Sequence, residues 1–113
     1  MKFRMTEKSY LVLLALAEEP RHGYGVVQAV LALSDGATKL SAGTLYGILD
    51  RLVAAGLAEA SGEIVVDGRL RRYYRLREAG LAVLATETSR LQALSRRAHR
   101  VLAAAPRPAL GGI

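Results

Sequence analysis

The sequence predicts a mainly α-helical fold with one small β-hairpin and a long helix at its C-terminal end. Segments with the apolar periodicity of helices occupy most of the chain. One Asp67-Gly68 pair lies between two segments of strand character and is typical of a two-residue hairpin turn. A chain of 113 residues favours a single domain with a modest core, so any further element needs a partner to pack on.

The first part of the chain predicts two short helices. Thr6 can cap a helix that runs to about residue 17 and stops before Pro20. After a turn at residues 21–23, a second helix is expected from about residue 24 to residue 33. It is apolar around much of its surface, so we expect it to be short and mostly buried.

A third helix is expected between Ser41, a good N-cap, and Gly56, a good residue just past a helix end. On a helical wheel its apolar side chains converge on one side; they are Leu45, Ile48, Leu49 and Leu52. The opposite side is small and polar, with Gly43, Gly47, Asp50, Arg51 and Ala54. Such a helix can approach another surface closely, as a helix that reads a DNA groove must.

The hairpin is expected to join residues 63–66 to residues 69–77, which hold five arginines and no acid. If Val66 pairs with Arg69, then Glu63 lies opposite Arg72 and gives it a cross-strand carboxylate. Alternation places one row of side chains on a cationic face: Arg69, Arg71, Tyr73, Arg75 and Arg77. Tyr74 points the other way, and core packing is its expected role.

A last helix is expected from about residue 78 to residue 104, with an imperfect heptad seam. The seam consists of Leu81, Leu84, Thr88, Leu91, Ser95, Ala98 and Leu102. At about 40 Å this helix is longer than the small domain beside it can cover, so we expect its stripe to pack on a second subunit. The expected organisation is a DNA-binding domain at 1–77, a dimerisation helix at 78–105 and a flexible tail at 106–113.

Positive charge is concentrated in the second half of the chain. The net charge is +6; residues 1–56 carry six bases and five acids (+1), and residues 57–113 carry ten bases and five acids (+5). A localised basic stripe suggests nucleic acid or an acidic membrane surface as partner. The absence of cysteine, of a signal peptide and of an apolar run long enough to span a bilayer favours a cytoplasmic protein without membrane insertion.

In this order, the elements describe a winged helix-turn-helix with a dimerisation helix. Several segments also resemble the PadR family of transcriptional regulators. They are residues 11–16 (LVLLAL), 22–24 (HGY), 41–46 (SAGTLY), 49–52 (LDRL), 56–57 (GL) and 71–76 (RRYYRL). The resemblance covers about residues 6 to 85, and Gly47 and Asp50 depart from the family pattern. It implies that the third helix enters the major groove and that an effector can alter the angle between two heads.

The candidate DNA-binding residues are Tyr24, Ser41, Thr44, Tyr46, Arg51, Arg69 and Arg71. Hydroxyl groups can donate to phosphates or bases, and arginines can reach phosphates or a guanine edge. The alternatives are that Ser41 is only an N-cap and that Tyr46 is only a half-buried ring. The arginines could likewise belong to a solvated strand edge, where their charges deter aggregation. The role of Asp50 is open: it can accept from a cytosine amino group or face solvent.

Enzymatic activity has little support, because the sequence has no cysteine, no phosphate-binding glycine loop and no metal-ligand spacing. No cofactor or metal is expected. The function we expect is sequence-specific regulation, as a homodimeric repressor on a palindromic operator in double-stranded DNA, with release by a small-molecule effector as one possibility. The alternative is a winged-helix protein-interaction module without sequence-specific DNA binding.

Overall fold

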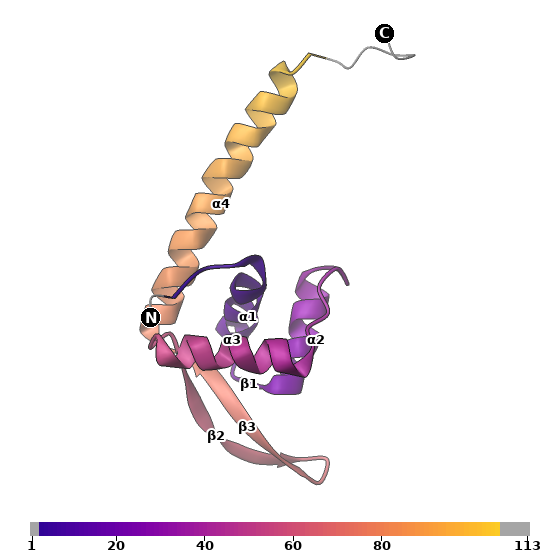
Figure 1. Ribbon diagram of the computed structural model, residues 1–113, viewed down its shortest axis with the longest axis vertical. Coiled ribbons are helices and arrows are strands. Elements are labelled where there is room, and N and C mark those ends of the chain that lie inside the picture. The colour runs from indigo at the N-terminus through magenta and orange to yellow at the C-terminus, as the bar shows by residue number, and fades with distance from the viewer. Residues whose placement is uncertain (1–2, 107–113) are drawn as a thin grey trace.

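The computed structural model of the chain describes residues 3–106 (Figure 1). The elements, in chain order, are α1 (Glu7–Glu18), β1 (Arg21–His22), α2 (Gly23–Leu33), α3 (Ala42–Ala54), β2 (Ala58–Val66), β3 (Arg69–Leu76) and α4 (Glu78–Ala104). Helices α1, α2 and α3 form a head, the β2–β3 hairpin extends from one side of it, and α4 leaves on the opposite side. The predicted mainly α-helical fold with a hairpin is confirmed.

The helices begin where the sequence predicts, because their first backbone amides find acceptors. Thr6 Oγ1 accepts from the Ser9 amide at 3.1 Å, and Ser41 Oγ accepts from the Thr44 amide at 3.2 Å. The predicted bounds of the last helix, residues 78 and 104, agree with those of α4. Apart from Pro106, the predicted tail at 106–113 lies outside the described residues.

The hairpin register is the predicted one, with Val66 opposite Arg69 and Glu63 opposite Arg72. Two features differ from the prediction. Strand β2 begins at Ala58 and contains a bulge between Ala60 and Gly62. The expected turn at residues 21–23 contains strand β1, which pairs with β3 in a sheet of order β1-β3-β2. A two-residue strand carries no periodic signal, which is why the sequence did not reveal it.

The core lies between the head helices and the base of the sheet. All four apolar residues predicted to converge on the inner side of α3 are buried. Tyr74 is buried as well, as predicted from strand alternation. At the start of α4, Gly80 packs directly on the Leu57 carbonyl oxygen, where a Cβ has no room. The Arg77 amide donates to the same oxygen at 2.9 Å, which fixes α4 to the end of α3.

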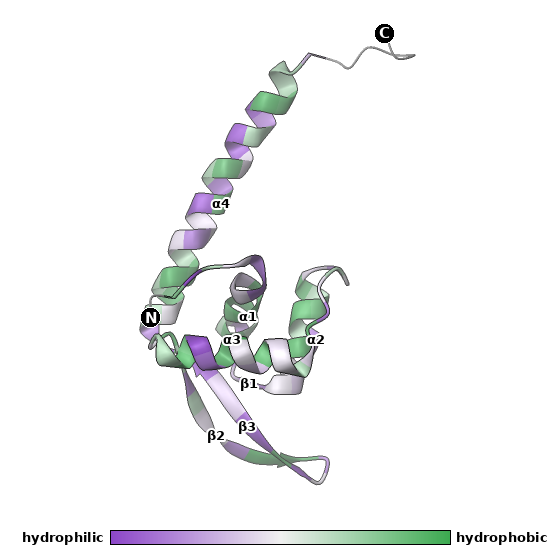
Figure 2. Cartoon of the chain, viewed as in Figure 1, coloured by the Kyte–Doolittle hydropathy of each residue, from purple (hydrophilic) through white to green (hydrophobic). Residues whose placement is uncertain are grey.

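Helix α4 is only partly covered by its own head. Apolar and polar residues are mixed along its length (Figure 2). Leu84, predicted for a seam with a second subunit, is buried in the core of its own head instead. Thr88, from the same predicted seam, meets the Tyr10 hydroxyl at 2.7 Å. The remaining apolar residues of α4 are largely exposed; they include Leu91, Leu94, Val101 and Leu102. Within residues 3–106, none of the helices has the length and apolar character that crossing a bilayer requires.

Candidate nucleic-acid interface

Helix α3 lies across the head, with its N-terminal end beside α2 and the hairpin below it (Figure 1). Its polar side is exposed, as the helical wheel predicts, because the four buried residues fix the rotation of the helix. Ser41 and Thr44 are both exposed at the N-terminal end. Their hydroxyl oxygens lie 3.0 Å apart in a hydrogen bond. Both predicted roles of Ser41, capping and a hydroxyl open to a ligand, are therefore compatible.

Tyr46 and Tyr24 both present their rings at the surface, with exposed fractions of 47% and 57%. Tyr46 packs over Gly23 at the start of α2, where an added Cβ would lie 2.5 Å from the tyrosine hydroxyl oxygen. A side chain at residue 23 would therefore displace the end of the Tyr46 ring from its position over α2. The two tyrosines thus border one surface at the junction of α2 and α3.

Arg51 turns back along α3 towards Gly47. A Cβ at Gly47 would lie 3.5 Å from Nη1 of Arg51, one turn away. The absence of a side chain at Gly47 leaves the guanidinium resting on the outward face of the helix. Asp50 is exposed on the same face, and within residues 3–106 it forms no ion pair.

The arginines of β3 and the residue after it differ in how they are paired. Arg72 lies 3.7 Å from Glu63, which confirms the predicted cross-strand pair. Arg75 donates to Glu59 through Nε at 2.9 Å and Nη2 at 2.7 Å. Arg77 lies 3.5 Å from the same carboxylate. Sequence reasoning missed Glu59 because the bulge in β2 sets its register.

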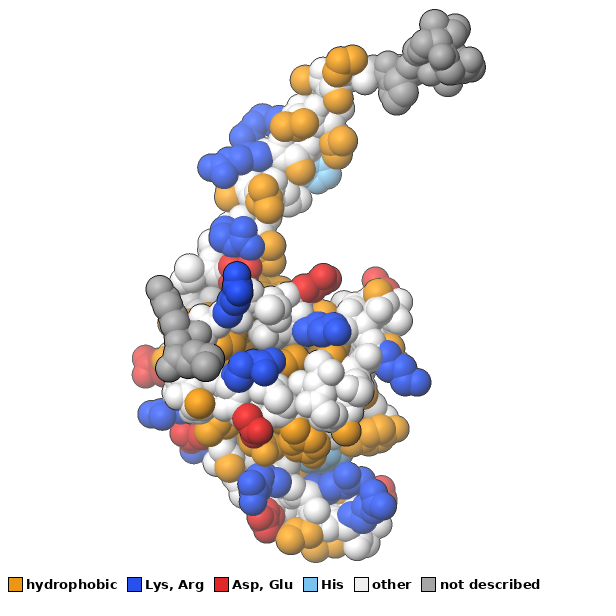
Figure 3. All heavy atoms as spheres, in the orientation of Figure 1, with side chains coloured by type: hydrophobic (Ala, Val, Ile, Leu, Met, Phe, Trp, Pro, Cys, Tyr) orange, Lys and Arg blue, Asp and Glu red, His pale blue; other side chains and the backbone are white. Residues whose placement is uncertain are grey.

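Arg69 and Arg71 have no acidic partner among the described residues. Arg71 is half-buried, and its Nε is a buried donor without a hydrogen-bond partner in that part of the chain. An unsatisfied buried donor is costly and marks a candidate contact for a ligand. In Figure 3, basic side chains lie over the hairpin, interspersed with acidic and hydrophobic ones. Of the arginines at residues 69–77, the two nearest the turn are thus the ones without an acidic partner in the described part of the chain.

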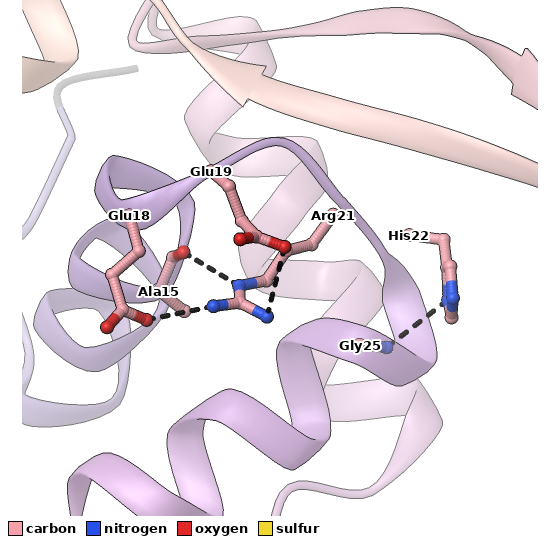
Figure 4. A network of polar contacts seen from close by, with 6 residues as sticks. All are labelled: Ala15, Glu18, Glu19, Arg21, His22 and Gly25. Carbon is pink, nitrogen blue, oxygen red and sulfur yellow. Dashed lines mark hydrogen bonds and ion pairs between the residues drawn. The ribbon is translucent and has the colours of Figure 1, made fainter.

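Strand β1 joins α1, α2 and the hairpin through two side chains (Figure 4). Arg21 donates through Nε to the Ala15 carbonyl oxygen at 3.0 Å, and its Nη2 lies 2.9 Å from Glu18. His22 caps α2, because its Nδ1 accepts from the Gly25 amide at 3.2 Å. The His22 ring meets Tyr73 edge to face, with 5.2 Å between ring centroids. Arg21 and His22 therefore fix the position of the hairpin relative to the helix-turn-helix.

Comparison with known proteins identifies the family. The model of the Transcriptional regulator PadR-like family matches residues 12–86. This chain belongs to the PadR-like family of transcriptional regulators. Members of the family are regulators and not enzymes, which confirms the prediction on enzymatic activity.

Relatives and solved structures of PadR-like proteins agree with this assignment. A transcriptional regulator of Mycobacterium tuberculosis is 42% identical over 80 residues, which is 71% of each chain. The crystal structure of a PadR family regulator from Eggerthella lenta superposes with a TM-score of 0.67 at 29% identity, covering 87% of this chain and 86% of that one. A PadR family regulator from Clostridium difficile has the same fold, with a TM-score of 0.73 at 19% identity, covering 86% of this chain and 99% of that one.

The PadR-like fold links Tyr46 of α3 to the strand that carries Arg71 through contacts at Gly23 and β1. Tyr46 contacts Gly23, the neighbouring His22 contacts Tyr73, and Arg71 lies on the same face of β3 as Tyr73. Ser41, Thr44 and Arg51 flank this region on α3. Among residues 3–106, no group of histidine, cysteine or acidic side chains is arranged to hold a metal ion.

A groove of about 580 Å³ lies on another side of this PadR-like head, between residues 3–5, Leu57 and the first turns of α4. Phe3, Met5 and Val83 give it an apolar lining, and Glu87 lies at its edge. Arg90 donates to Glu87 at 2.7 Å; this hydrogen bond lowers the pKa of Glu87 and raises the pKa of Arg90. The groove follows the first turns of α4 and reaches Ala55, the residue that caps the C-terminal end of α3.

Proposed function

We propose that this regulator is a homodimeric, sequence-specific DNA-binding repressor that recognises a palindromic operator. Helix α3 enters the major groove, and the hairpin acts as a wing that contacts the flanking backbone. The observation that carries the proposal is the series of contacts that links α3 to the wing: Tyr46 packs on Gly23, and the neighbouring His22 packs on Tyr73. Hydroxyl groups lie at the α3 end of this series, and the wing carries Arg69 and Arg71, which have no acidic partner within residues 3–106.

The candidate DNA-binding residues fall into two groups: those suited to phosphate contacts, which position the protein on DNA, and those suited to base contacts, which determine sequence preference. Arg69, Arg71 and the N-terminal end of α3 with Ser41 suit phosphate contacts, which add affinity without sequence information. Thr44 and Arg51 lie on the exposed side of α3 and suit contacts with base edges. Tyr24 and Tyr46, at the α2–α3 junction, suit the backbone beside the groove.

We infer dimerisation from the length and surface of α4. Its exposed leucines and valine extend beyond the head, and a second copy would cover them. In this arrangement residues 1–77 form the DNA-binding domain and residues 78–105 the dimerisation helix. Two copies of α3 would then reach successive major grooves about 34 to 36 Å apart. As a DNA-binding regulator, the protein would act in the cytoplasm.

A small-molecule effector fits the same arrangement. The apolar groove lined by Phe3, Met5 and Val83 opens beside the α4 stripe, where the second subunit would lie. A ligand bound there would change the angle between the two heads and so the spacing of the two α3 helices. The apolar lining favours an uncharged or weakly polar ligand.

The alternative function is a protein-interaction winged helix without sequence-specific DNA binding. The observation in its favour is the exposed apolar stripe of α4, which suits a foreign helix as well as a second copy. DNA sequence preference separates the two functions, because the alternative predicts only salt-sensitive binding to any duplex.

The test is selection of the best site from a library of genomic duplexes, followed by titration against that site and random DNA. We expect preference for a palindromic site by at least about a thousandfold. Arg71→Ala should weaken binding to all sequences and lower the salt slope by about one unit, and Thr44→Ala should mainly reduce sequence preference. Equal affinity of the parent for the selected site and random DNA would exclude the repressor.

A further inference from the structure

The middle of the outward face of α3 holds one acidic residue, Asp50. Its neighbours on this face are glycine and alanine, which have little or no side chain. Gly43 and Gly47 lie one turn apart on this face, and a Cβ added at Gly43 would meet no other atom within 4 Å. Ala54 continues the small surface one turn beyond Asp50. A helix backbone with this surface can come close to base edges, so a short side chain such as that of aspartate can reach them.

Within residues 3–106, the carboxylate of Asp50 has no ion-pair or hydrogen-bond partner. It is exposed, and no lysine or arginine of residues 3–106 lies within ion-pair distance of it. Asp50 lines a second groove, of about 730 Å³, between α3 and residues 3–9, and Arg4 and Arg51 line it as well. Positive charge is therefore near the carboxylate without forming an ion pair with it. An unpaired carboxylate facing DNA is repelled by phosphates. A hydrogen bond accepted from a base amino group can offset this repulsion.

The neighbouring side chain supplies the complementary group. Arg51 rests over Gly47, so its donors project on the same outward face. In the major groove, guanine presents the O6 and N7 acceptors, which suit arginine, and its paired cytosine presents an N4 amino donor, which suits aspartate. Adenine–thymine pairs also present one donor, but they have no pair of acceptors that suits a guanidinium.

We propose that Asp50 and Arg51 together read one guanine–cytosine base pair in each half-site, with Arg51 donating to guanine and Asp50 accepting from the cytosine N4 amino group. The inference rests on the proposed function, because it requires α3 in the major groove. It makes Asp50 a residue that selects sequence at some cost in overall affinity for DNA.

The first experiment compares the parent with Asp50→Ala on the selected operator and on variants changed one base pair at a time. The parent should prefer guanine–cytosine at one position of each half-site by about tenfold or more. In Asp50→Ala this preference should fall about tenfold, while affinity for random DNA rises because a negative charge is removed. Arg51→Ala should lower the preference for guanine–cytosine at the same position. Asp35→Asn removes one exposed charge in the turn before α3 and should change neither quantity.

The second experiment removes the amino group from DNA instead of the carboxylate from the protein. Replacing the cytosine with 2-pyrimidinone, which lacks the N4 amino group, should weaken parent binding about tenfold and leave Asp50→Ala binding unchanged. Circular dichroism and thermal melting would verify that the variants remain folded.

The outcomes separate this inference from the proposed function. A parent without preference for any site overturns both. A parent that prefers a palindrome, together with an Asp50→Ala variant of unchanged base preference, overturns only the role of Asp50. If the Asp50 and Arg51 variants lose sequence preference at different positions of the operator, the two residues do not contact the same base pair, and the inference is overturned.

Discussion

Glu59 limits the charge that the wing can present to DNA, and Glu59→Gln tests this directly. Its carboxylate holds Arg75 through two hydrogen bonds of 2.9 and 2.7 Å and lies 3.5 Å from Arg77. Glutamine keeps the shape of the side chain and one acceptor oxygen but removes the charge. The formal net charge of +6 rises by one, and two guanidinium groups lose their anionic partner.

The two expected effects differ greatly in size. The side chains of Glu59 and Arg75 are 37% and 57% exposed, so solvent screens the pair and its loss should cost less than about 1 kcal/mol of unfolding free energy. Each guanidinium that gains a phosphate contact steepens the dependence of log K on log salt by about 0.9. We therefore expect a melting temperature within about 5 °C of the parent, and a salt slope steeper by about one to two units.

The assay is fluorescence anisotropy with random duplex DNA across a range of salt concentrations. Glu63→Gln is the matched control, because Glu63 holds only Arg72, at 3.7 Å. This variant should steepen the dependence of log K on log salt by at most about one unit. An unchanged slope in Glu59→Gln would refute the reasoning. Arg75 and Arg77 would then lie beyond reach of the backbone, and only the arginines near the turn would contact DNA.

Three further substitutions test how the head and α4 are built. Gly80→Ala should lower the unfolding free energy by about 1 to 3 kcal/mol in urea titrations, since the clash with the Leu57 carbonyl exceeds a gain of at most about 1 kcal/mol in helix propensity; an unchanged midpoint would contradict the close approach. Arg21→Met should cost about 1 to 2 kcal/mol by the same assay, because the Ala15 carbonyl loses its donor; a loss below about 0.3 kcal/mol would show that Arg21 adds little. Leu94→Glu should give a monomer in sedimentation at micromolar concentration, whereas Leu70→Glu, on the wing and 65% exposed, should stay dimeric; a dimeric Leu94→Glu variant would exclude α4 as the interface.

The features that the sequence predicted correctly depend on local chemistry. The caps at Thr6 and Ser41, the hairpin at Asp67-Gly68 and the extent of α4 each follow from residues close together in the chain. The Glu63–Arg72 pair was predictable because a two-residue turn fixes the register near it.

The features that were missed depend on contacts between distant segments. Strand β1 exists because Arg21 and His22 pair with Tyr74 and Tyr73, about fifty residues later in the chain. Glu59 faces Arg75 only because β2 bulges before Gly62. Leu84 has the spacing of a dimer seam, yet it is buried in its own head, since periodicity defines an apolar stripe without identifying its partner.

In the proposed dimer, the junction between the head and α4 would determine how a change at the interface between the subunits reaches DNA. At the start of α4, Gly80 packs on the Leu57 carbonyl. Two turns later, Thr88 Oγ1 forms a hydrogen bond with the Tyr10 hydroxyl and donates to the Leu84 carbonyl at 2.8 Å. With contacts at two levels, α4 cannot tilt alone without losing packing at one of them. A ligand that rotates α4 against its partner would therefore carry the whole head with it. Over a helix of about 40 Å, a rotation of a few degrees is enough to shift the two α3 helices out of register with successive grooves.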